Sequence, residues 1–181
     1  MPKFLILILF ILFLEEAKAE NKSKIIENLK NTFNMSFEFE QDINGKIENG
    51  NCLIKYPKKI YCKYKKNNKI LISNGKSLVI KTNTSYYRYS LEKTPLNLIL
   101  DKDFLIKKIK LLNENIITNN SISYRIVEKD NEIILFFDGK TFDLIGWENK
   151  DIYQNYNTTF ISSIIKNKKL ESNLFEVPSP N

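Results

Sequence analysis

Alternation of apolar and polar residues dominates the sequence from Met35 to Leu91. Turn residues interrupt it about every ten positions, a spacing typical of sheets built from short strands. A period of two indicates strands that bury one face and expose the other. Asn44-Gly45 and Asn74-Gly75 are turn signals of the kind that close antiparallel hairpins. We therefore expect six consecutive antiparallel strands, a meander that curves towards a barrel or half-barrel.

The stretch Asn49–Gly75 is the centre of this meander. Its apolar residues form two period-two sets, namely Cys52, Ile54 and Tyr56, then Ile60, Cys62 and Tyr64. We expect Pro57-Lys58-Lys59 to form the loop, which places Tyr56 opposite Ile60 and Ile54 opposite Cys62. Both sets then share one apolar face, and a sheet must cover such a face or hold a ligand against it.

The two cysteines allow two alternatives. In the expected register Cys52 and Cys62 are diagonal neighbours, which is poor geometry for a disulfide unless a bulge intervenes. An exported protein nevertheless reaches an oxidising compartment, where disulfides persist. Either the residues form a disulfide, or they are two small buried thiols.

Residues 1–19 have the three parts of a secretory signal peptide. Lys3 is a minimal basic region, Phe4–Leu14 is an apolar run, and Ala17-Lys18-Ala19 is a small-x-small cleavage site. The run is too short to span a bilayer as a helix, which needs about 20 residues. We expect cleavage before Glu20. Residues 20–181 then form one soluble, exported domain, since no linker, repeat or low-complexity tract divides them.

Two segments have helical patterns. Ile25, Ile26, Leu29 and Phe33 recur at helical spacing and predict an amphipathic helix over residues 22–33. Thr94 is expected to cap a short apolar helix that has Pro95 at its first position and contains Leu96, Leu98, Ile99 and Leu100. Residues 103–112 fit either a second short helix or a helix-to-strand transition. These segments are expected to cover the sheet.

The last third of the chain returns to strand patterns. We expect strands over residues 116–118, 121–129, 132–137, 141–148 and 155–165. The chain is therefore a single, mainly β domain with covering α-helices.

Composition excludes several kinds of chemistry. The chain contains no histidine, which excludes Ser-His-Asp and Cys-His nucleophiles and histidine metal sites. Two cysteines cannot form a cysteine-rich zinc site. No spacing of carboxylates or lysines indicates catalysis, so we expect no enzymatic activity, no metal and no cofactor.

The charge allows three kinds of partner. A formal net charge of +7 is compatible with an acidic protein, a nucleic acid or an anionic membrane surface. Nucleic acid is disfavoured, because export removes the chain from it and no nucleic-acid motif is present. Six lysines gather around the central reversal, Lys58, Lys59, Lys63, Lys65, Lys66 and Lys69. They are either a solvated hairpin tip or a docking surface for an acidic membrane partner or anionic headgroups.

Six motifs follow one another over residues 22–177. They are the helix followed by Phe37-Glu38-Phe39-Glu40-Gln41, then Gly50–Pro57, Leu71–Leu78, Thr94–Leu100, Leu144–Trp147 and Leu174-Phe175. In order and spacing this series resembles the LolA family, the periplasmic carriers of outer-membrane lipoproteins. The resemblance covers essentially the whole chain after the expected cleavage site.

The resemblance implies an unclosed antiparallel β-barrel, or half-barrel, with a helical lid over an apolar cavity for acyl chains. The expected cavity residues are Phe37, Phe39, Cys52, Ile54, Tyr56, Ile60, Cys62, Tyr64, Leu96, Ile99 and Leu100. The implied partners are acylated lipoproteins, an inner-membrane lipoprotein-releasing transporter and an outer-membrane lipoprotein receptor. The implied setting is the periplasm, and we expect a monomer.

One position departs from the family. The family has a functional arginine directly before the proline, linked to lid opening, where this chain has Tyr56 before Pro57. A tyrosine hydroxyl is one donor in place of the five of arginine, so the mechanism of lid control does not carry over. Three alternatives to lipoprotein transport remain. The first is a module of the same fold for another lipid or glycolipid, the second is a structural β domain with a filled core, and the last in rank is a histidine-free hydrolase.

Overall fold

The computed structural model describes residues 20–112, 116–118, 120–129, 131–150, 154–171 and 173–180. The expected signal peptide, residues 1–19, lies outside them. The first half contains helix α1 (20–31) and strands β1 (Asn34–Ile43), β2 (Lys46–Lys55), β3 (Lys59–Tyr64), β4 (Ile70–Asn74), β5 (Ser77–Lys81) and β6 (Tyr86–Ser90). The second contains η1 (Leu91–Lys93), α2 (Leu96–Ile99), α3 (Lys102–Leu111), β7 (Ile116–Thr118), β8 (Ser121–Glu128), β9 (Asn131–Asp138), β10 (Leu144–Lys150) and β11 (Tyr156–Lys166).

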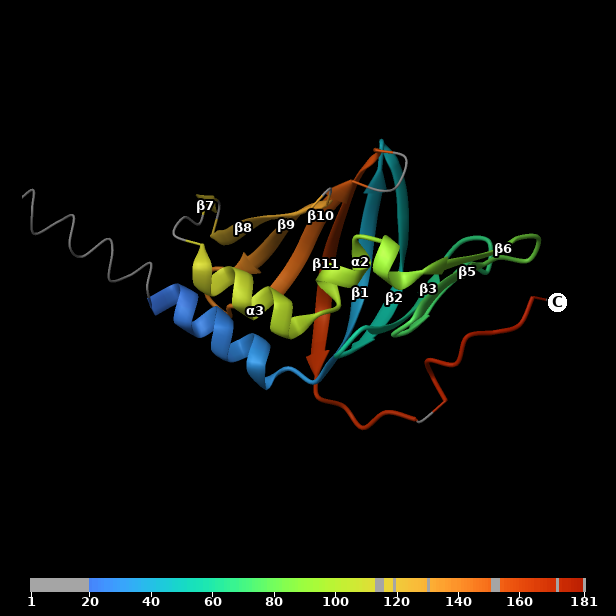
Figure 1. Cartoon of the computed structure of the whole chain (residues 1–181), viewed down its shortest axis with the longest axis horizontal. Helices are drawn as coiled ribbons and strands as arrows, with labels where there is room; N and C mark the ends of the chain where they lie inside the picture. The colour runs from blue at the N-terminus through green and yellow to red at the C-terminus, as the bar shows by residue number, and fades with distance from the viewer. Residues whose placement is uncertain are drawn as a thin grey trace, which may run out of the picture.

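All described strands belong to one antiparallel sheet (Figure 1). Its order is β6-β5-β4-β3-β2-β1-β11-β10-β9-β8-β7, so β6 and β7 are edges and the sheet is not closed. The first six strands form one half as a meander, and the pairing of β1 with β11 joins it to the other half. The expected half-barrel with covering helices is confirmed.

Helices α1 and α3 lie side by side over the half of the sheet that contains β8, β9 and β10 (Figure 1). The two helices are tied together by a hydrogen bond from Lys102 Nζ of α3 to the carbonyl of Lys30 in α1, 3.1 Å long. Beneath them the core is filled, with Ile25, Leu105, Ile109, Tyr124 and Phe137 at 0% exposure. This half of the domain is therefore an ordinary packed core.

The ambiguous segment after residue 102 is a helix. Asp101 is its N-cap, because its carboxylate accepts a hydrogen bond of 3.0 Å from the backbone N–H of Phe104. Leu105, Ile106 and Ile109 recur at helical spacing and are buried. The capping residue and the apolar stripe together decide for a helix over a strand.

Two expected helix boundaries were wrong. Helix α1 ends at residue 31, and Phe33, expected on its apolar stripe, is 64% exposed with Lys102 Nζ 5.0 Å from its ring centroid. At the start of α2 the N-cap is Pro95, and Thr94 instead donates its hydroxyl to the carbonyl of Leu91 at 2.8 Å.

The expected register between β2 and β3 was also wrong. The turn is Tyr56-Pro57-Lys58, and the pairs are Ile54 with Ile60 and Cys52 with Cys62. Because the three-residue turn begins one residue earlier than expected, every residue of β2 pairs with the β3 residue two positions nearer the turn. The two cysteines are therefore directly opposite and form a disulfide, with their Cα atoms 4.1 Å apart.

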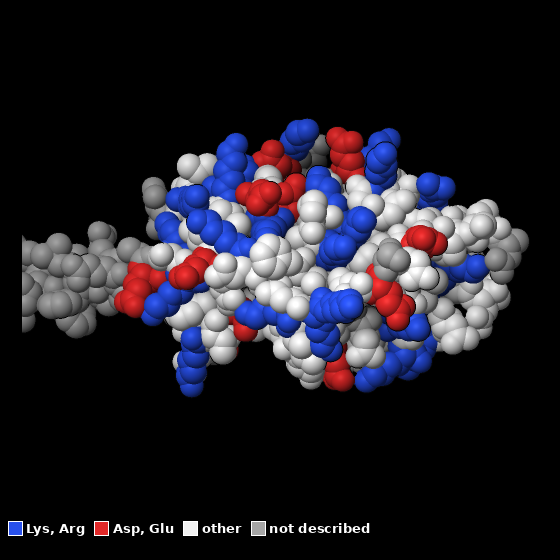
Figure 2. Space-filling model, turned by 90° about the horizontal axis from the view of Figure 1, so that it is seen from below, with Lys and Arg blue, Asp and Glu red and all other residues white. Residues whose placement is uncertain are grey.

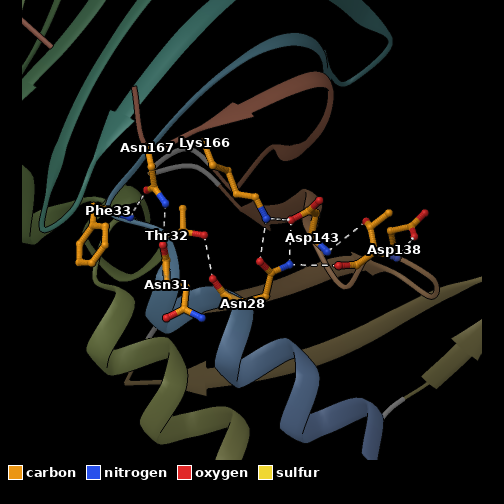
Figure 3. A network of polar contacts seen from close by, with 9 residues as sticks. Asn28, Asn31, Thr32, Phe33, Asp138, Asp143, Lys166 and Asn167 are labelled. Atoms are coloured by element: carbon orange, nitrogen blue, oxygen red, sulfur yellow. Dashed lines mark hydrogen bonds and ion pairs between the residues drawn. The ribbon is translucent and has the colours of Figure 1, made fainter. Parts of the chain in front are cut away.

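A polar network fixes the C-terminal end of α1 to the sheet (Figure 3). Asn28 Nδ2 donates to Asp143 Oδ1 at 2.8 Å and to the carbonyl of Thr141 at 3.1 Å. Lys166 Nζ donates to Asn28 Oδ1 at 2.7 Å, and Asn167 Nδ2 donates to the carbonyl of Asn31 at 2.8 Å. Helix α1 is thus a fixed cover.

We expect Asn28→Ala to lower the free energy of unfolding by about 1–2 kcal/mol, because it leaves the half-buried Asp143 and Lys166 with fewer partners. Urea denaturation measures the change. Asn31→Ala is the matched control, since Asn31 is exposed and enters the network through its backbone carbonyl. Equal losses in the two variants would contradict the anchoring role of Asn28.

Candidate functional site

The other half of the domain contains a partly open cavity. Its volume is about 240 Å³, and it lies between the concave face of the sheet and the segment Thr94–Leu96 at the start of α2. One water molecule needs roughly 15 Å³, so the space is far larger than a packing defect. The lining residues are Phe39, Gln41, Ile43, Cys52, Ile60, Cys62, Tyr64, Lys69, Leu71, Leu78, Ile80, Tyr89, Thr94, Pro95, Leu96, Trp147, Asn149, Asn157 and Thr159.

Strand alternation makes most of this lining apolar. Leu71 of β4 and Leu78 of β5 face the cavity, whereas their neighbours Ile72 and Val79 pair with each other and are not among its lining residues. Side chains on successive strand positions point to opposite faces of the sheet, so every second residue of a strand lies in the cavity wall.

Gly50 allows two aromatic rings to meet at this wall. It pairs with Phe39 on one side and with Tyr64 on the other, and these rings contact edge to face at 4.9 Å between centroids. A Cβ at position 50 would lie 2.7 Å from Phe39 Cε1 and 2.2 Å from the carbonyl oxygen of Lys63. A larger residue here would therefore displace the ring of Phe39.

The far side of the cavity is polar. Tyr64 donates its hydroxyl to Gln41 Oε1 at 3.2 Å, and Gln41 Nε2 donates to Thr159 Oγ1 at 3.2 Å. Burial, with a smaller contribution from the nearby Glu48 charge, raises the pKa of the Tyr64 hydroxyl, which therefore remains a neutral donor.

The charged groups at this polar side are paired. Lys69 Nζ lies 2.5 Å from Glu48 Oε2 and 4.0 Å from the centroid of the Tyr64 ring. Burial by itself raises the pKa of the Glu48 carboxyl, but the hydrogen bond and charge of Lys69, helped by Lys46, outweigh it and hold the pKa below its usual value. The carboxylate is therefore ionised and neutralises Lys69.

Six of the eleven expected cavity residues line this space, namely Phe39, Cys52, Ile60, Cys62, Tyr64 and Leu96. The other five, Phe37, Ile54, Tyr56, Ile99 and Leu100, are buried in the surrounding core. The disulfide between β2 and β3 is part of the wall. That any of these residues contacts a ligand remains a prediction.

Tyr56, the expected position of lid control, points away from the cavity. It lines a small space of about 10 Å³ with Leu29 of α1 and Leu144 of β10. Its hydroxyl is buried without a hydrogen-bond partner among the described residues, and burial raises its pKa. Its role in the lid stays a prediction.

Lys58, two residues further on, makes the polar contacts with the lid. Its Nζ donates to Asn97 Oδ1 at 3.0 Å and lies 3.3 Å from Asp101 Oδ2. Its backbone N–H also bonds the carbonyl of Leu100 at 2.8 Å. The turn between β2 and β3 thus holds α2 in place. Sequence reasoning missed this role, because Lys58 was one of six similar lysines.

Sequence reasoning also missed Trp147, Asn149, Asn157 and Thr159, which β10 and β11 contribute to the wall. These residues are more than 100 positions from β1 in the sequence, and the pairing of β1 with β11 brings them to it. The alternation in the last third of the chain predicted the strands β10 and β11. No local sequence signal predicts that β11 pairs with β1.

Of the six lysines near the reversal, Lys58 and Lys69 are in ion pairs and Lys63, Lys65 and Lys66 are exposed. Figure 2 shows basic side chains spread over the face that it displays, with acidic ones between them. Both interpretations of these lysines remain open.

No described helix is both long and apolar enough to cross a membrane. No group of three or more acidic or cysteine side chains among the described residues is placed to hold a metal ion.

The sequence profile of the family described as outer membrane lipoprotein carrier protein LolA matches residues 20–178. The chain belongs to the LolA family. The match covers nearly all the described residues, and the family is described as a carrier rather than an enzyme. No curated protein matches the chain.

Solved structures with a similar fold have little sequence in common with this LolA-family chain. An uncharacterised conserved protein from Thermus thermophilus has a TM-score of 0.50 at 5% identity, over 89% of this chain and 94% of that one. A LolA superfamily protein from Nitrosomonas europaea has a TM-score of 0.45 at 10% identity, over 88% and 97%. A DUF1329 family protein from Desulfovibrio piger has a TM-score of 0.46 at 9% identity, over 87% and 96%. At such identities the likeness concerns the fold alone.

We expect Lys58→Met to loosen α2 without unfolding the domain. Half-exposed ion pairs of this kind contribute roughly 0.5–1 kcal/mol, so amide exchange at residues 98–100 should accelerate by about threefold. Hydrogen exchange with mass spectrometry measures this rate.

The matched control is Lys59→Met, which removes a half-buried lysine from the adjacent strand. Unchanged exchange at α2 in the Lys58 variant, or equal acceleration in both, would show that Lys58 does not hold the lid.

Proposed function

We propose that this protein is a periplasmic carrier that shields the acyl chains of lipoproteins in its cavity. It receives them from an inner-membrane lipoprotein-releasing transporter and passes them to an outer-membrane receptor. The observation that carries the proposal is the vacant, mainly apolar space beneath the segment that begins α2. Membership of a family described as lipoprotein carriers supports it.

The cavity suits binding that must be reversible. Each buried methylene contributes about 0.8 kcal/mol, so a single acyl chain supplies ample affinity. At about 240 Å³ the space is below the roughly 300–1,000 Å³ of typical ligand pockets, so cargo must widen it. Helix α2 has only four residues, and one residue of the β2–β3 turn, Lys58, supplies the side-chain contacts that hold it to the strands. Helix α2 is therefore the element that we expect to move.

The proposal also covers export of the protein and its state in the periplasm. Residues 1–19 act as a cleaved signal peptide, and residues 20–181 act as a single carrier domain and as a monomer. The disulfide supports an oxidising compartment, since such bonds persist there.

The experiment is to purify the protein expressed with its leader and to identify what it carries by mass spectrometry. Diacylated or triacylated peptides are the result we expect. Free phospholipid or glycolipid would favour a general lipid binder of the same fold. A protein that carries neither and does not bind an apolar fluorescent dye would be a structural domain, contrary to the proposal.

Ile80→Trp tests whether the cavity is the binding site. Ile80 lines it and is only half-buried, so an indole there fills the space without overpacking the core. Excluding three methylenes of an acyl chain forfeits about 2.4 kcal/mol, so dye and lipopeptide affinity should fall by roughly 50-fold. Fluorescence titration gives both affinities.

Val127→Trp is the matched control, because Val127 is 60% exposed on β8 and does not line the cavity. We expect its affinities to equal those of the unchanged protein. Full binding by the Ile80 variant would place the ligand elsewhere.

A further inference from the structure

Asn149 is a buried amide that faces the cavity. It lies on β10, is 7% exposed and lines the cavity beside Trp147. Among the residues that the structure describes, none makes a hydrogen bond with its side chain. Buried polar groups almost always have partners, because an unmade hydrogen bond costs free energy. The amide atoms of Asn149 are not among the fully buried side-chain atoms without a partner, which in the described part of the chain are the hydroxyls of Tyr56 and Tyr124, so they keep access to the cavity. A ligand in the cavity can therefore reach them.

The neighbours of Asn149 form one polar patch. Across the ladder it pairs with Asn157 of β11, and the next inward pair is Trp147 with Thr159. Thr159, 2% exposed, is opposite Gln41 of β1 and accepts its hydrogen bond. Thr159 and Gln41 thus bond each other, whereas no described residue occupies the hydrogen-bonding groups of Asn149.

The patch carries no unpaired charge among the described residues. Lys69 is the one ionisable side chain with a formal charge among the described lining residues, and Glu48 neutralises it at 2.5 Å. A carboxylate or phosphate entering the cavity would lose its hydration without gaining a free cation, which is costly. A neutral polar group meets no such penalty.

The opposite side of the same cavity is hydrocarbon. Leu71, Leu78 and Leu96 line it, together with the disulfide. A ligand that satisfies both sides has an apolar chain joined to a neutral group able to accept a hydrogen bond. The carbonyl that links an acyl chain to its carrier molecule is such a group.

We propose that Asn149 binds the neutral carbonyl of an acyl linkage, with an N-acyl amide preferred, while the chain extends beneath α2. This inference rests on the proposed carrier function and specifies which part of the cargo is recognised. The Nδ2 group of Asn149 can donate one hydrogen bond to the carbonyl of an amide or of an ester. The N–H of a trans secondary amide points away from its carbonyl, so the preference for the amide comes from its carbonyl, which is the stronger acceptor of the two. Esters occur in lipoproteins and phospholipids alike, whereas N-acyl amides distinguish the lipoprotein.

The test uses four ligands with one chain length, N-methyl lauramide, methyl laurate, laurate and dodecane, each displacing an apolar dye from the unchanged protein at neutral pH. We expect the amide to bind more tightly than the ester, because its carbonyl is the stronger hydrogen-bond acceptor. The laurate anion should be the weakest of the three polar ligands. Equal affinity for amide and laurate, or tighter binding of the ester than of the amide, overturns the inference.

Asn149→Leu then removes the polar group at constant size. The ratio of amide to dodecane affinity should fall by about fivefold. Asn51→Leu, an exposed position on β2, is the control and should keep the ratio of the unchanged protein. An unchanged ratio in the Asn149 variant overturns the inference.

The outcomes separate this inference from the carrier proposal. If neither dye nor any acyl chain binds, the carrier function fails and the inference fails with it. If dye and chains bind but the head group and Asn149 make no difference, the carrier function stands and the inference alone fails. Should Asn149→Leu not fold, the ligand series with the unchanged protein decides.

Discussion

The pairing of β1 with β11 is the interaction on which the rest of the structure depends. It joins a strand near the start of the chain to the last strand, with Phe39 opposite Ile161 and Gln41 opposite Thr159. Without it the meander of β1–β6 and the sheet of β7–β11 would be separate, and each would expose an apolar face. Because of it one curved face receives residues from both halves, and the cavity gains a wall from each.

The two halves use that face differently. Under α1 and α3 the face is filled, with Tyr124, Phe137 and Leu105 fully buried, and α1 is anchored by the network around Asn28 and Asp143. Near α2 the same face is left partly vacant. A helix of four residues cannot fill the space that two long helices fill on the other side. The packed half therefore supplies stability, and the vacant half can change shape as a ligand enters.

Much of the fold could be predicted from alternation alone. The six strands and the inward placement of Cys52, Ile54 and Ile60 follow from a period of two and from turn residues. The register of β2 with β3 could not be predicted, because the local pattern fits a three-residue turn that begins at Tyr56 as well as one that begins at Pro57. In the observed register Cys52 and Cys62 are directly opposite rather than diagonal, and they form a disulfide.

The candidate site could be predicted only in part, for the same reason. Phe39, Ile60 and Leu96 belong to local patterns, whereas Asn149 and Thr159 join the wall through strand order. Nothing local distinguishes Asn149 from the many other asparagines of the chain. Asn149 is a candidate ligand-binding residue because its side chain lines the cavity and has no hydrogen-bond partner among the described residues. Both are properties of the folded protein.

The proposed transport requires that acyl chains occupy the vacant space between the curved sheet and α2. A crystal structure of the protein saturated with a brominated acyl chain tests it most directly, because anomalous scattering locates the bromine without reference to the protein. We predict bromine within the cavity, between Leu71, Leu78 and Leu96, with α2 displaced outward. Bromine on the outer face of the sheet, or an unoccupied cavity in a protein that binds the chain in solution, would contradict the account.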